Sequence, residues 1–414
     1  MDSIRYLLGL DRQPVYHDPG ITETRASPAK IQTVMGTSTK PTPPASKHHY
    51  KPAGNVEEEL AAALDDILTN CTQCGACRRD CLFLQRHALP FEFAEAFTKG
   101  TLDAMAPFRC SLCRLCTAVC PEKLDPSRLI WHMRCYFMQQ GAVSIRPYRQ
   151  LLAYERLGGS RLFDLFQLPA GCDTVFFPGC ALAGSYPHAL LHAISALRQR
   201  VANLGIILSC CAKPSHDLGR MDYFSAVMDE LLDSFRRRRI QTLITACPSC
   251  HQVFSDYGST LTVRSIYEYL STPTGDEPAT TLTNLAIHDP CATRFHPDIQ
   301  QGVRSVLYNR GCTVRELNHR QEKTFCCGEG GAVGFIDSSY QKMWAEKRCG
   351  ETGNEPLVTY CAGCVQTLSP RRPVHHVLEL LFGPRNTKIK PARPPITYLN
   401  RLWVKWKIKN MNII

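Results

Sequence analysis

Hydrophobic residues recur at helical spacing in the first part of the chain, up to about residue 170. An apolar stripe runs through Leu60, Leu64, Ile67 and Leu68. Asn55 precedes this stripe, with Glu58 three residues further on, a pattern typical of a helix N-cap. Helix is also predicted for residues 127–169 and for the short stretch FEFAEAF. We therefore predict a helical first part that begins at Asn55.

Short β-rich runs alternate with helical stretches from Cys172 onward. The runs are TVFFPGC, GIILSCC, TLITACPSC, NLAIHDPC, CTVREL and LVTYCAGC. Helices are expected from Pro187, from Met221, near 298–309 and near 339–348. The order of elements occurs twice, with cysteines at nearly constant offsets, which indicates an internal duplication of an α/β unit. In parallel α/β sheets the ligand crevice lies outside the carboxyl ends of the strands, so cysteines that follow strands should converge there.

The formal net charge of +11 is concentrated at the two ends of the chain. Residues 384–414 contain eight Lys or Arg and no acidic residue, and residues 1–53 add a net +3. The body of the chain therefore carries no net charge, and nucleic-acid binding is not expected. Residues 1–53 are also rich in Pro, Ser, Thr and Lys, a composition that predicts disorder.

The 22 cysteines are the unusual feature of the composition. The first residues contain no apolar stretch long enough for a signal peptide, and no run of about 20 apolar residues predicts a membrane span. Disulfide frameworks are typical of small secreted chains, whereas this chain is long. We therefore expect a cytoplasmic protein whose thiolates bind metal.

Two runs of four cysteines, CTQCGACRRDC and CSLCRLCTAVCP, have the C-x₂-C-x₂-C-x₃-C spacing of bacterial ferredoxins. In this pattern the fourth cysteine of each run ligates the cluster of the other run. Two cubane [4Fe-4S] clusters are expected, held by a first ferredoxin set of Cys71, Cys74, Cys77 and Cys120 and a second ferredoxin set of Cys110, Cys113, Cys116 and Cys81. Leu82 replaces the usual proline after the first run. Paired zinc sites are the alternative, but zinc favours separate C-x₂-C knuckles.

Five further cysteines mark each α/β half in the order C…CC…C-x-x-C. The first five-cysteine set is Cys180, Cys210, Cys211, Cys247 and Cys250, and the second is Cys291, Cys326, Cys327, Cys361 and Cys364. This arrangement resembles the cysteine-rich CCG domains of the heterodisulfide reductase family, which includes the iron–sulfur subunits of glycolate, lactate and glycerol-3-phosphate oxidoreductases. A dicluster ferredoxin module followed by two CCG domains resembles the D-type subunit of heterodisulfide reductase in particular, over about residues 55–383.

The resemblance implies that each five-cysteine set binds a noncubane [4Fe-4S] cluster, and that the two clusters face each other across a pocket where a substrate disulfide is reduced. All ten of these cysteines are then catalytic as well as metal-ligating. Gly328, Gly330 and Gly331 match the glycine run of the family and would let backbone approach the second cluster. The first cysteine pair departs from the pattern, because CCAKP replaces CC-Gly. Pairs of buried structural cysteines are the alternative for both CC motifs.

Several reactive side chains lie near these motifs without belonging to them. His288 and Asp289 precede Cys291 and are candidates to orient a ligand or deliver a proton, but a histidine that caps a strand end is the favoured interpretation. The same interpretation is favoured for His216. Ordinary buried thiols are expected for the cysteines outside every pattern, which are Cys135, Cys172, Cys312 and Cys349.

The fold class that follows is α+β and multidomain, a helical dicluster ferredoxin module followed by two duplicated α/β, Rossmann-like CCG domains. The expected parts are a disordered basic segment at 1–53, a two-[4Fe-4S] ferredoxin-type domain at 54–140, a helical linker at 141–170, the two CCG domains at 171–277 and 278–383, and a basic amphipathic tail at 384–414.

The basic tail has more than one interpretation. A helix would place Leu399, Leu402, Trp403 and Trp406 on one face and Arg401, Lys405 and Lys409 on another. Such a helix is typical of a peripheral contact with an anionic membrane or a partner. Residues 404–409 also alternate as a strand would, and a packed or frayed terminus is the favoured interpretation.

We expect an iron–sulfur oxidoreductase that passes electrons from the two cubane clusters to the CCG clusters and reduces a disulfide-type substrate. The alternative is an electron-transfer subunit that relays electrons from a flavoprotein oxidising glycolate, lactate or glycerol-3-phosphate to quinone or another acceptor. A structural zinc scaffold is a third class.

The expected partner is a membrane cytochrome b or an FAD-dependent oxidoreductase. No G-x-G-x-x-G fingerprint opens a nucleotide site, so a flavin is expected in the partner and not in this chain. The expected location is cytoplasmic, or peripheral on the inner face of the cytoplasmic membrane.

Overall fold

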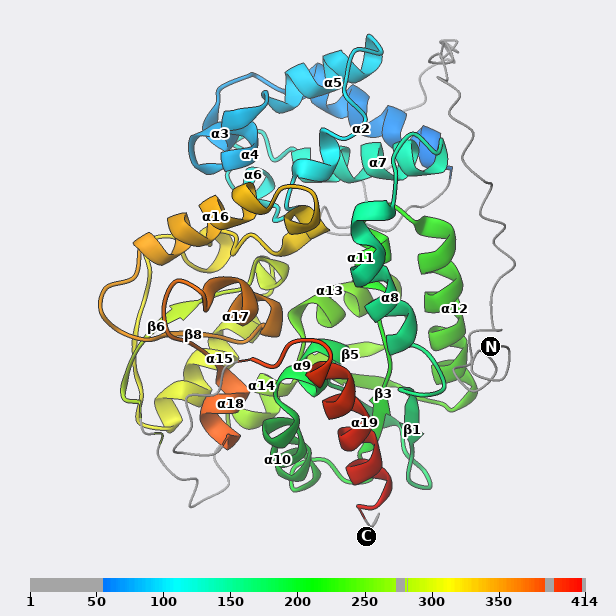
Figure 1. Ribbon diagram of the computed structural model, residues 1–414, viewed down its shortest axis with the longest axis vertical. Coiled ribbons are helices and arrows are strands. Elements are labelled where there is room, and N and C mark those ends of the chain that lie inside the picture. The colour runs from blue at the N-terminus through cyan, green and yellow to red at the C-terminus, as the bar shows by residue number, and fades with distance from the viewer. Residues whose placement is uncertain (1–54, 273–279, 281, 384–390, 412–414) are drawn as a thin grey trace.

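The computed structural model describes residues 55–272, 280, 282–383 and 391–411, so the predicted disordered segment 1–53 lies outside the described residues. The N-terminal part is helical, with α2 Val56–Asn70, α3 Ala76–Asp80, α4 Leu82–Arg86, α5 Pro90–Thr98, η1 Pro107–Arg109, α6 Leu115–Ala118 and α7 Pro126–Gln139 (Figure 1). The side chain of Asn55 accepts a hydrogen bond from the Glu57 backbone N–H at 3.1 Å, which confirms the predicted N-cap. α2 ends at Cys71, so the first cysteine run begins where the helix stops.

The helical module has an apolar core that continues into the second α/β domain through Phe325 and Trp344. α2 packs against α5 and α7 and buries Leu60 and Ile67 of the predicted stripe. Trp131 of α7 and Phe108 of η1 are completely buried. Burial of one large apolar side chain contributes about 1.5–3 kcal/mol. The loops that carry the two cysteine runs are therefore attached to a stably packed body.

The first α/β domain is a five-stranded sheet covered by helices. Its strands are β1 Leu165–Gln167, β2 Thr174–Phe177, β3 Gly205–Leu208, β4 Thr242–Thr245 and β5 Thr262–Ser265, in the order β1-β3-β2-β4-β5. Its helices are α9 Cys180–Ser185, α10 Pro187–Arg198, α11 Lys213–Asp217, α12 Met221–Arg237, α13 Pro248–Tyr257 and α14 Ile266–Leu270. The pairs β3–β2, β2–β4 and β4–β5 are parallel, which requires the helical crossovers that the alternating sequence pattern predicts.

The predicted helical linker 141–170 is helical only in part. It contains η2 Arg146–Tyr148 and α8 Arg149–Gly158, but β1 then joins the first sheet as an antiparallel edge strand beside β3. The expectation of helix as far as residue 169 is therefore wrong at its end. β3 offers backbone groups at the edge of the parallel sheet, and pairing with them, together with burial of Leu165, outweighs the local helical pattern.

The second α/β domain repeats the first. Its strands are β6 Asn284–His288, β7 Thr313–Arg315, β8 Leu357–Thr359 and β9 Val374–His376, all parallel and in the order β7-β6-β8-β9. Its helices are η3 Cys291–Thr293, α15 Pro297–Asn309, η4 Gln321–Lys323, η5 Gly330–Phe335, α16 Ser338–Gly350, α17 Ala362–Leu368 and α18 Val377–Phe382. This order matches β3-β2-β4-β5 of the first sheet, which confirms the predicted duplication and the fold class.

The helical module lies across the same end of both α/β domains (Figure 1). α16 of the second domain lies next to α3, and the Lys347 ammonium donates to the Asp80 carbonyl oxygen at 2.8 Å. α7 reaches the first domain, where the Trp131 indole N–H donates to the His216 carbonyl oxygen at 2.9 Å. The module is therefore in direct contact with both halves of the duplication.

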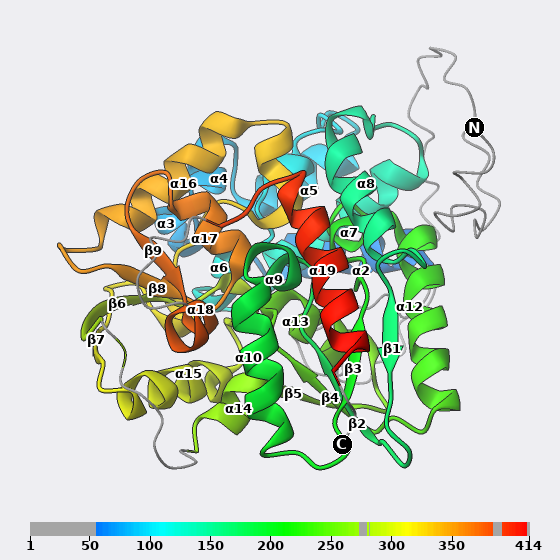
Figure 2. The same cartoon turned by 60° about the horizontal axis from the view of Figure 1, so that its bottom comes forward.

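The C-terminal segment forms a helix, α19 Ile396–Lys409, that packs on the first α/β domain against α9, α10 and β1 (Figure 2). The packed interpretation is correct, and the strand interpretation of residues 404–409 is wrong. The buried face consists of Thr397, Arg401, Val404 and Ile408, so Arg401 lies inside and not on the predicted polar face. Leu399 and Trp406 are 63% and 58% exposed.

Among the described residues, no helix has both the length and the apolar content that a membrane span requires.

Candidate metal centres

The cysteines of the two five-cysteine sets lie mainly just after the carboxyl ends of parallel strands, as predicted. Cys180 begins α9 after β2, Cys210 follows β3, and Cys247 is the N-cap of α13 after β4. In the second domain Cys291 follows β6, and Cys361 is the N-cap of α17 after β8. The α/β frame therefore presents both sets where such folds bind ligands.

The thiols of the first five-cysteine set lie together. The Sγ atoms of Cys250 and Cys211 are 3.3 Å apart. A hydrogen bond from Cys210 lowers the pKa of the Cys180 thiol to about 6, and Cys247 is hydrogen bonded to Cys250. Grouped thiols are the soft donors that iron–sulfur clusters use, so these five residues fit the expected centre.

The second five-cysteine set is equally compact. Cys326 is hydrogen bonded to Cys291 and Cys327, and Cys327 is hydrogen bonded to Cys364. Cys361 is hydrogen bonded to Cys364. All five thiols are thus connected through direct contacts, and they fit a second centre of the same kind.

The first ferredoxin set is brought together at the surface. Burial, followed by the charges of Cys71, Cys120 and Cys74, raises the pKa of the Cys77 thiol to about 11. These are the four expected ligands, including the cysteine that crosses from the other run. Cys74 is exposed and the other three are half-buried, so this set lies at the edge of the protein.

The second ferredoxin set lies deeper. Burial, followed by the charges of Cys113 and Cys110, raises the pKa of Cys81, and the Cys116 thiol interacts with all three of these residues. The four thiols line one cavity together with Leu129 and other apolar side chains of the module. All four cysteines are buried, so water has little access to this set.

A direct contact connects the helical module to the second α/β domain. The Cys113 thiol is hydrogen bonded to Cys326, and this bond lowers the pKa of Cys113 to about 6. Cys113 belongs to the second ferredoxin set and Cys326 to the second five-cysteine set. The two sets are therefore immediate neighbours, a relationship that the cysteine spacing alone does not reveal.

The two five-cysteine sets lie near each other. The Cys361 thiol interacts with the Cys247 thiol of the other set, and Glu329 lies near both Cys327 and Cys180. Glu329 is exposed, so solvent reaches the region between the two sets. The surrounding protein still removes much of the hydration of the carboxylate, and this desolvation, followed by the charge of Cys327, raises the pKa of Glu329 to about 7.

The predicted glycines allow close backbone contact, mainly between parts of the protein. A Cβ on Gly330 would lie 2.5 Å from the Ser111 carbonyl oxygen, and a Cβ on Gly331 would lie 2.5 Å from that of Cys110. These glycines therefore let the second α/β domain dock on the second cysteine run. Gly328 has a φ of 97° and packs against α16. Approach of this loop to a bound cluster stays a prediction.

Ala212 adopts the backbone conformation that glycine has in the other half. It follows the first cysteine pair, as Gly328 follows the second, and its φ is 52°. A positive φ is uncommon for a residue with a side chain. Although CCAKP replaces CC-Gly in the first α/β domain, the residue after the cysteine pair therefore keeps a left-handed backbone conformation.

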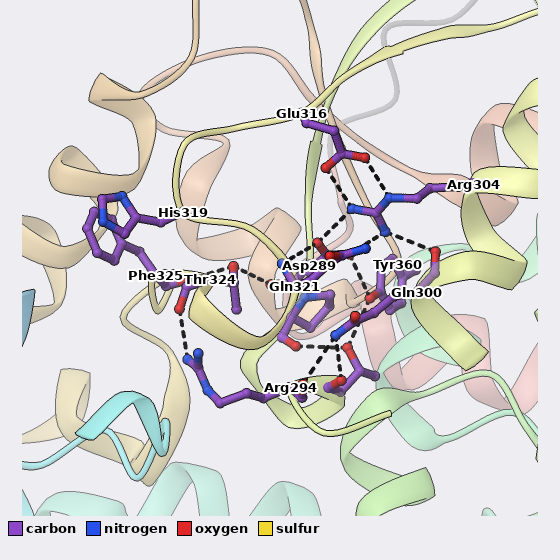
Figure 3. Close-up of polar contacts among 12 residues, drawn as sticks. Asp289, Arg294, Gln300, Arg304, Glu316, His319, Gln321, Thr324, Phe325 and Tyr360 are labelled. Carbon is purple, nitrogen blue, oxygen red and sulfur yellow. Dashed lines mark hydrogen bonds and ion pairs between the residues drawn. The ribbon is translucent and has the colours of Figure 1, made fainter. Parts of the chain in front are cut away.

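Asp289 organises the loops around the second five-cysteine set. It is completely buried and accepts hydrogen bonds from Arg304 at 2.9 and 3.0 Å, from the Tyr360 hydroxyl at 3.0 Å and from the Gln321 backbone N–H at 2.9 Å (Figure 3). The Thr324 hydroxyl donates to its carbonyl oxygen at 2.9 Å. The network joins the segments that precede three of the cysteines, so Asp289 positions ligand loops and does not itself reach the thiols.

His288 ends a strand, as expected, but its side chain also lies near the thiols of the second five-cysteine set. It is completely buried at the end of β6, and a ring nitrogen lies within 4.8 Å of the Cys327 and Cys364 thiols. It belongs to the surroundings of the second five-cysteine set. His216, in contrast, stacks on Trp131 with ring centroids 4.9 Å apart, at the contact between α7 and the first domain.

The four cysteines outside the motifs behave as ordinary thiols. Cys349 is half-buried and the other three are buried. Burial raises the pKa of each thiol, so all four are neutral at physiological pH. They are Cys135, Cys172, Cys312 and Cys349.

Comparison with known protein families agrees with this arrangement. Residues 66–124 match the 4Fe-4S dicluster domain, and residues 174–255 and 285–369 match the cysteine-rich domain named CCG. The eight cysteines of the ferredoxin sets and the ten of the five-cysteine sets all fall within these matches.

Three relatives are similar in sequence to parts of this chain. The EtfAB:quinone oxidoreductase of Syntrophomonas wolfei is 24% identical over 291 residues, which covers 68% of this chain and 37% of the relative. A probable membrane-anchored ferredoxin of Chromohalobacter salexigens is 22% identical over 305 residues, with 64% and 45% coverage. A protein of Archaeoglobus profundus, named as similar to the C-type subunit of heterodisulfide reductase, is 28% identical over 116 residues, with 25% and 58% coverage. The chain thus spans between 37% and 58% of the length of these relatives.

The domain matches, the duplicated α/β frame and the relatives agree on an iron–sulfur electron-transfer protein. The chain belongs to the iron–sulfur proteins that resemble the D-type subunit of heterodisulfide reductase, which combine a 4Fe-4S dicluster domain with cysteine-rich CCG domains.

Proposed function

We propose that the chain conducts electrons from a surface-exposed cubane [4Fe-4S] cluster on the first ferredoxin set to two noncubane clusters on the five-cysteine sets, where a disulfide-type substrate is reduced. The observation that carries this proposal is the unbroken succession of thiol sets from the surface to the space between the α/β domains.

The succession begins at exposed Cys74. The first and second ferredoxin sets are adjacent, because α3, which carries Cys77, packs against α6, which carries Cys116. The contact between Cys113 and Cys326 then leads into the second domain. From there the space near Glu329 leads to the first domain. Each step is between neighbouring sets, as a chain of one-electron carriers requires.

The protein residues supply what such carriers need. Four or five thiolates hold each centre, and iron–sulfur clusters, once bound, supply one-electron transfer. The buried second ferredoxin set is shielded from water by apolar side chains such as Leu129. Solvent shielding and nearby charge are among the factors that set the potential of such a centre.

The space between the five-cysteine sets suits a small thiol substrate. Reduction of a disulfide R–S–S–R′ breaks the S–S bond, takes up two electrons and two protons and releases RSH and R′SH. Two facing one-electron centres would deliver the electrons in turn, one to each sulfur. Cys180 and Cys247 are half-buried residues and Glu329 is an exposed one, so this region is the proposed point of substrate entry.

A second candidate function is a relay from a flavoprotein partner to quinone, without a thiol substrate. The observation that favours it is the EtfAB:quinone oxidoreductase, which is similar over 68% of this chain. In that case the first ferredoxin set would receive electrons from the flavoprotein, and the five-cysteine sets would pass them on to the acceptor.

One experiment separates the two candidates. The protein is purified without oxygen, its iron and sulfide are quantified, and its clusters are reduced and then mixed with a panel of disulfides or with a soluble quinone. Disulfide reduction predicts reoxidation of the clusters with release of free thiols. A relay predicts reoxidation by quinone while every disulfide stays intact. Material that contains zinc and no iron would contradict both functions.

Peripheral attachment to a membrane is part of the proposal. One relative is named a probable membrane-anchored ferredoxin, and α19 exposes Leu399 and Trp406 beside the basic side chains Lys407 and Lys409. Exposed aromatic and apolar side chains flanked by lysine are typical of helices that lie on anionic lipid.

A further inference from the structure

Arg134 ties the three parts of the protein together through backbone carbonyl oxygens. This α7 residue is completely buried. Its guanidinium donates to Pro107 at 3.0 Å, to Asp217 at 2.8 Å, to Gly331 at 3.1 Å and to Cys110. These carbonyl groups belong to the helical module, to the first α/β domain and to the second. One side chain thus fixes the second cysteine run against both halves of the duplication.

Arg294 makes a similar connection on the other side of the same run. It is 2% exposed and donates to the Thr324 carbonyl oxygen at 2.8 Å (Figure 3). It also donates to the Cys113 carbonyl oxygen at 2.8 Å and to that of Glu322. The Glu322–Thr324 segment leads directly to Cys326. Arg294 therefore holds Cys113 beside the cysteine pair of the second domain.

Both arginines are buried cations whose hydrogen bonds, in the described part of the chain, all go to neutral carbonyl groups. A buried charge costs several kcal/mol unless an opposite charge compensates for it. The Cys110 thiol of the second ferredoxin set is the first negative partner of Arg134, ahead of the Asp217 carboxylate, and the charge of Arg294 acts on the Cys113 thiol. A thiolate-ligated cluster at this set would supply the compensating negative charge.

The first ferredoxin set has a different electrostatic environment. The largest charge effects on Cys77 come from the other three thiols of its own set, and the set lies at the surface. The neighbouring Arg78 and Arg79 of α3 are exposed, so water and salt screen their charges. Nearby positive charge stabilises the reduced, more negative form of an iron–sulfur cluster and so raises its reduction potential. A cluster on the second ferredoxin set would therefore have the higher reduction potential, which favours electron transfer from the first set to the second.

We propose that Arg134 and Arg294 are positioning residues that raise the reduction potential of the cluster on the second ferredoxin set above that of the first, and hold that cluster against Cys326. This inference rests on the proposed function, since it requires clusters at both sets. It concerns the direction of electron flow and does not depend on the identity of the final acceptor.

The test is an EPR-monitored redox titration of the holoprotein and four variants. Arg294→Gln and Arg134→Gln remove the charge, Arg294→Lys keeps it, and Arg236→Gln is the matched control, because Arg236 is an exposed residue of α12 whose side chain pairs with Asp233 at 2.8 Å. In both charge-removing variants we expect one cubane signal to shift to lower potential while the other stays in place. Arg294→Lys should shift less, and Arg236→Gln should not shift.

Several results would overturn the inference. Unchanged potentials in folded, iron-replete Arg294→Gln would do so, as would equal shifts of both cubane signals. A shift in Arg294→Lys as large as that in Arg294→Gln would remove charge as the cause. If Arg134→Gln fails to fold, Arg294 alone decides the outcome. Wild-type protein that binds no iron would instead defeat the proposed function, whereas unchanged potentials in an active, iron-loaded protein would defeat only this inference.

Discussion

Cys113 and Cys326 are hydrogen-bonded neighbours, although one belongs to the second ferredoxin set and the other to the second five-cysteine set. Both are buried, and the buried Arg294 holds the backbone on each side of the contact. The equivalent cysteine pair of the first domain, Cys210 and Cys211, has no such contact with the ferredoxin sets among the interactions of the described residues. The duplication is therefore asymmetric, and on the proposed route electrons from the module would reach the second domain first.

Cys326→Ser should remove one noncubane centre and interrupt the route. We expect the iron content to fall, both cubane EPR signals to remain, and the reoxidation of reduced protein by its acceptor to slow by at least about tenfold, because a ligand and its neighbours both change. Cys349→Ser is the control, since Cys349 is a half-buried neutral thiol outside the motifs. Equal iron content and equal reoxidation rates in the two variants would contradict a ligand role for Cys326.

Much of this arrangement follows from the sequence, because cysteine spacing and the alternation of strands and helices are local properties. The two ferredoxin sets, the duplication and the positions of most strands were predictable in this way. β1 was not, because its pairing with β3 is a contact at the edge of a sheet whose edge the sequence does not mark. The buried face of α19 was also not predictable, because Arg401 donates to the Gly158 carbonyl oxygen at 3.0 Å, an interaction that only the packed domain provides.

The contacts between the parts were beyond prediction for a similar physical reason. The sequence gives no sign that Gly330 and Gly331 touch the second cysteine run, since a glycine-rich loop beside a cysteine pair fits approach to a cluster equally well. His288 was undervalued because a buried histidine at a strand end is common in the absence of any ligand. Only the three-dimensional convergence on Cys327 and Cys364 distinguishes it.

Gly330→Ala should loosen the contact between the helical module and the second α/β domain. The added Cβ would lie 2.5 Å from the Ser111 carbonyl oxygen, so the backbone must shift. We expect the free energy of unfolding to fall by about 2 kcal/mol, measured by anaerobic urea denaturation. In Gly350→Ala no atom lies within 4 Å of the new Cβ, and the change should stay within about 1 kcal/mol. Similar losses in the two variants would argue against a tight interdomain contact.

Asp289→Asn should disturb the loops around the second five-cysteine set. The completely buried carboxylate pairs with Arg304, which keeps Glu316 as a second partner, so we expect the substitution to cost about 1.5–3 kcal/mol. Asp233→Asn removes a partner from the exposed Arg236 pair and should cost at most about 1 kcal/mol. Urea denaturation gives both values, and iron analysis shows whether the second centre survives. A cost for Asp289→Asn as small as that of the surface pair would mean that the network does not hold these loops.

The stability of the second domain should depend on pH through His376. This buried residue caps α18 by accepting a hydrogen bond from the Leu378 N–H at 3.2 Å, and burial lowers its pKa from 6.5 to about 3. Between these values the unfolded chain binds a proton that the folded chain does not, so stability falls as the pH drops below about 6.5. His376→Asn keeps a capping acceptor without titrating. As the pH falls through this range, the unfolding free energy of the wild type should therefore drop by up to about 1.4 kcal/mol more per pH unit than that of His376→Asn. Parallel pH profiles would rule out this contribution.

The two faces of α19 should respond differently to substitution. Ile408 is completely buried in an apolar core that both α/β domains share, and Ile408→Ala should lower the unfolding free energy by about 2–5 kcal/mol. Trp406, 58% exposed, carries little of this packing, so Trp406→Ala should change stability by about 0.5 kcal/mol or less. It removes an aromatic anchor from the exposed face, however, and should weaken sedimentation of the protein with anionic lipid vesicles. Neutral vesicles are the matched control, because the neighbouring lysines should confer no binding to them. Unchanged sedimentation of Trp406→Ala, or equal binding to neutral and anionic vesicles, would show that this face of α19 does not mediate contact with a membrane.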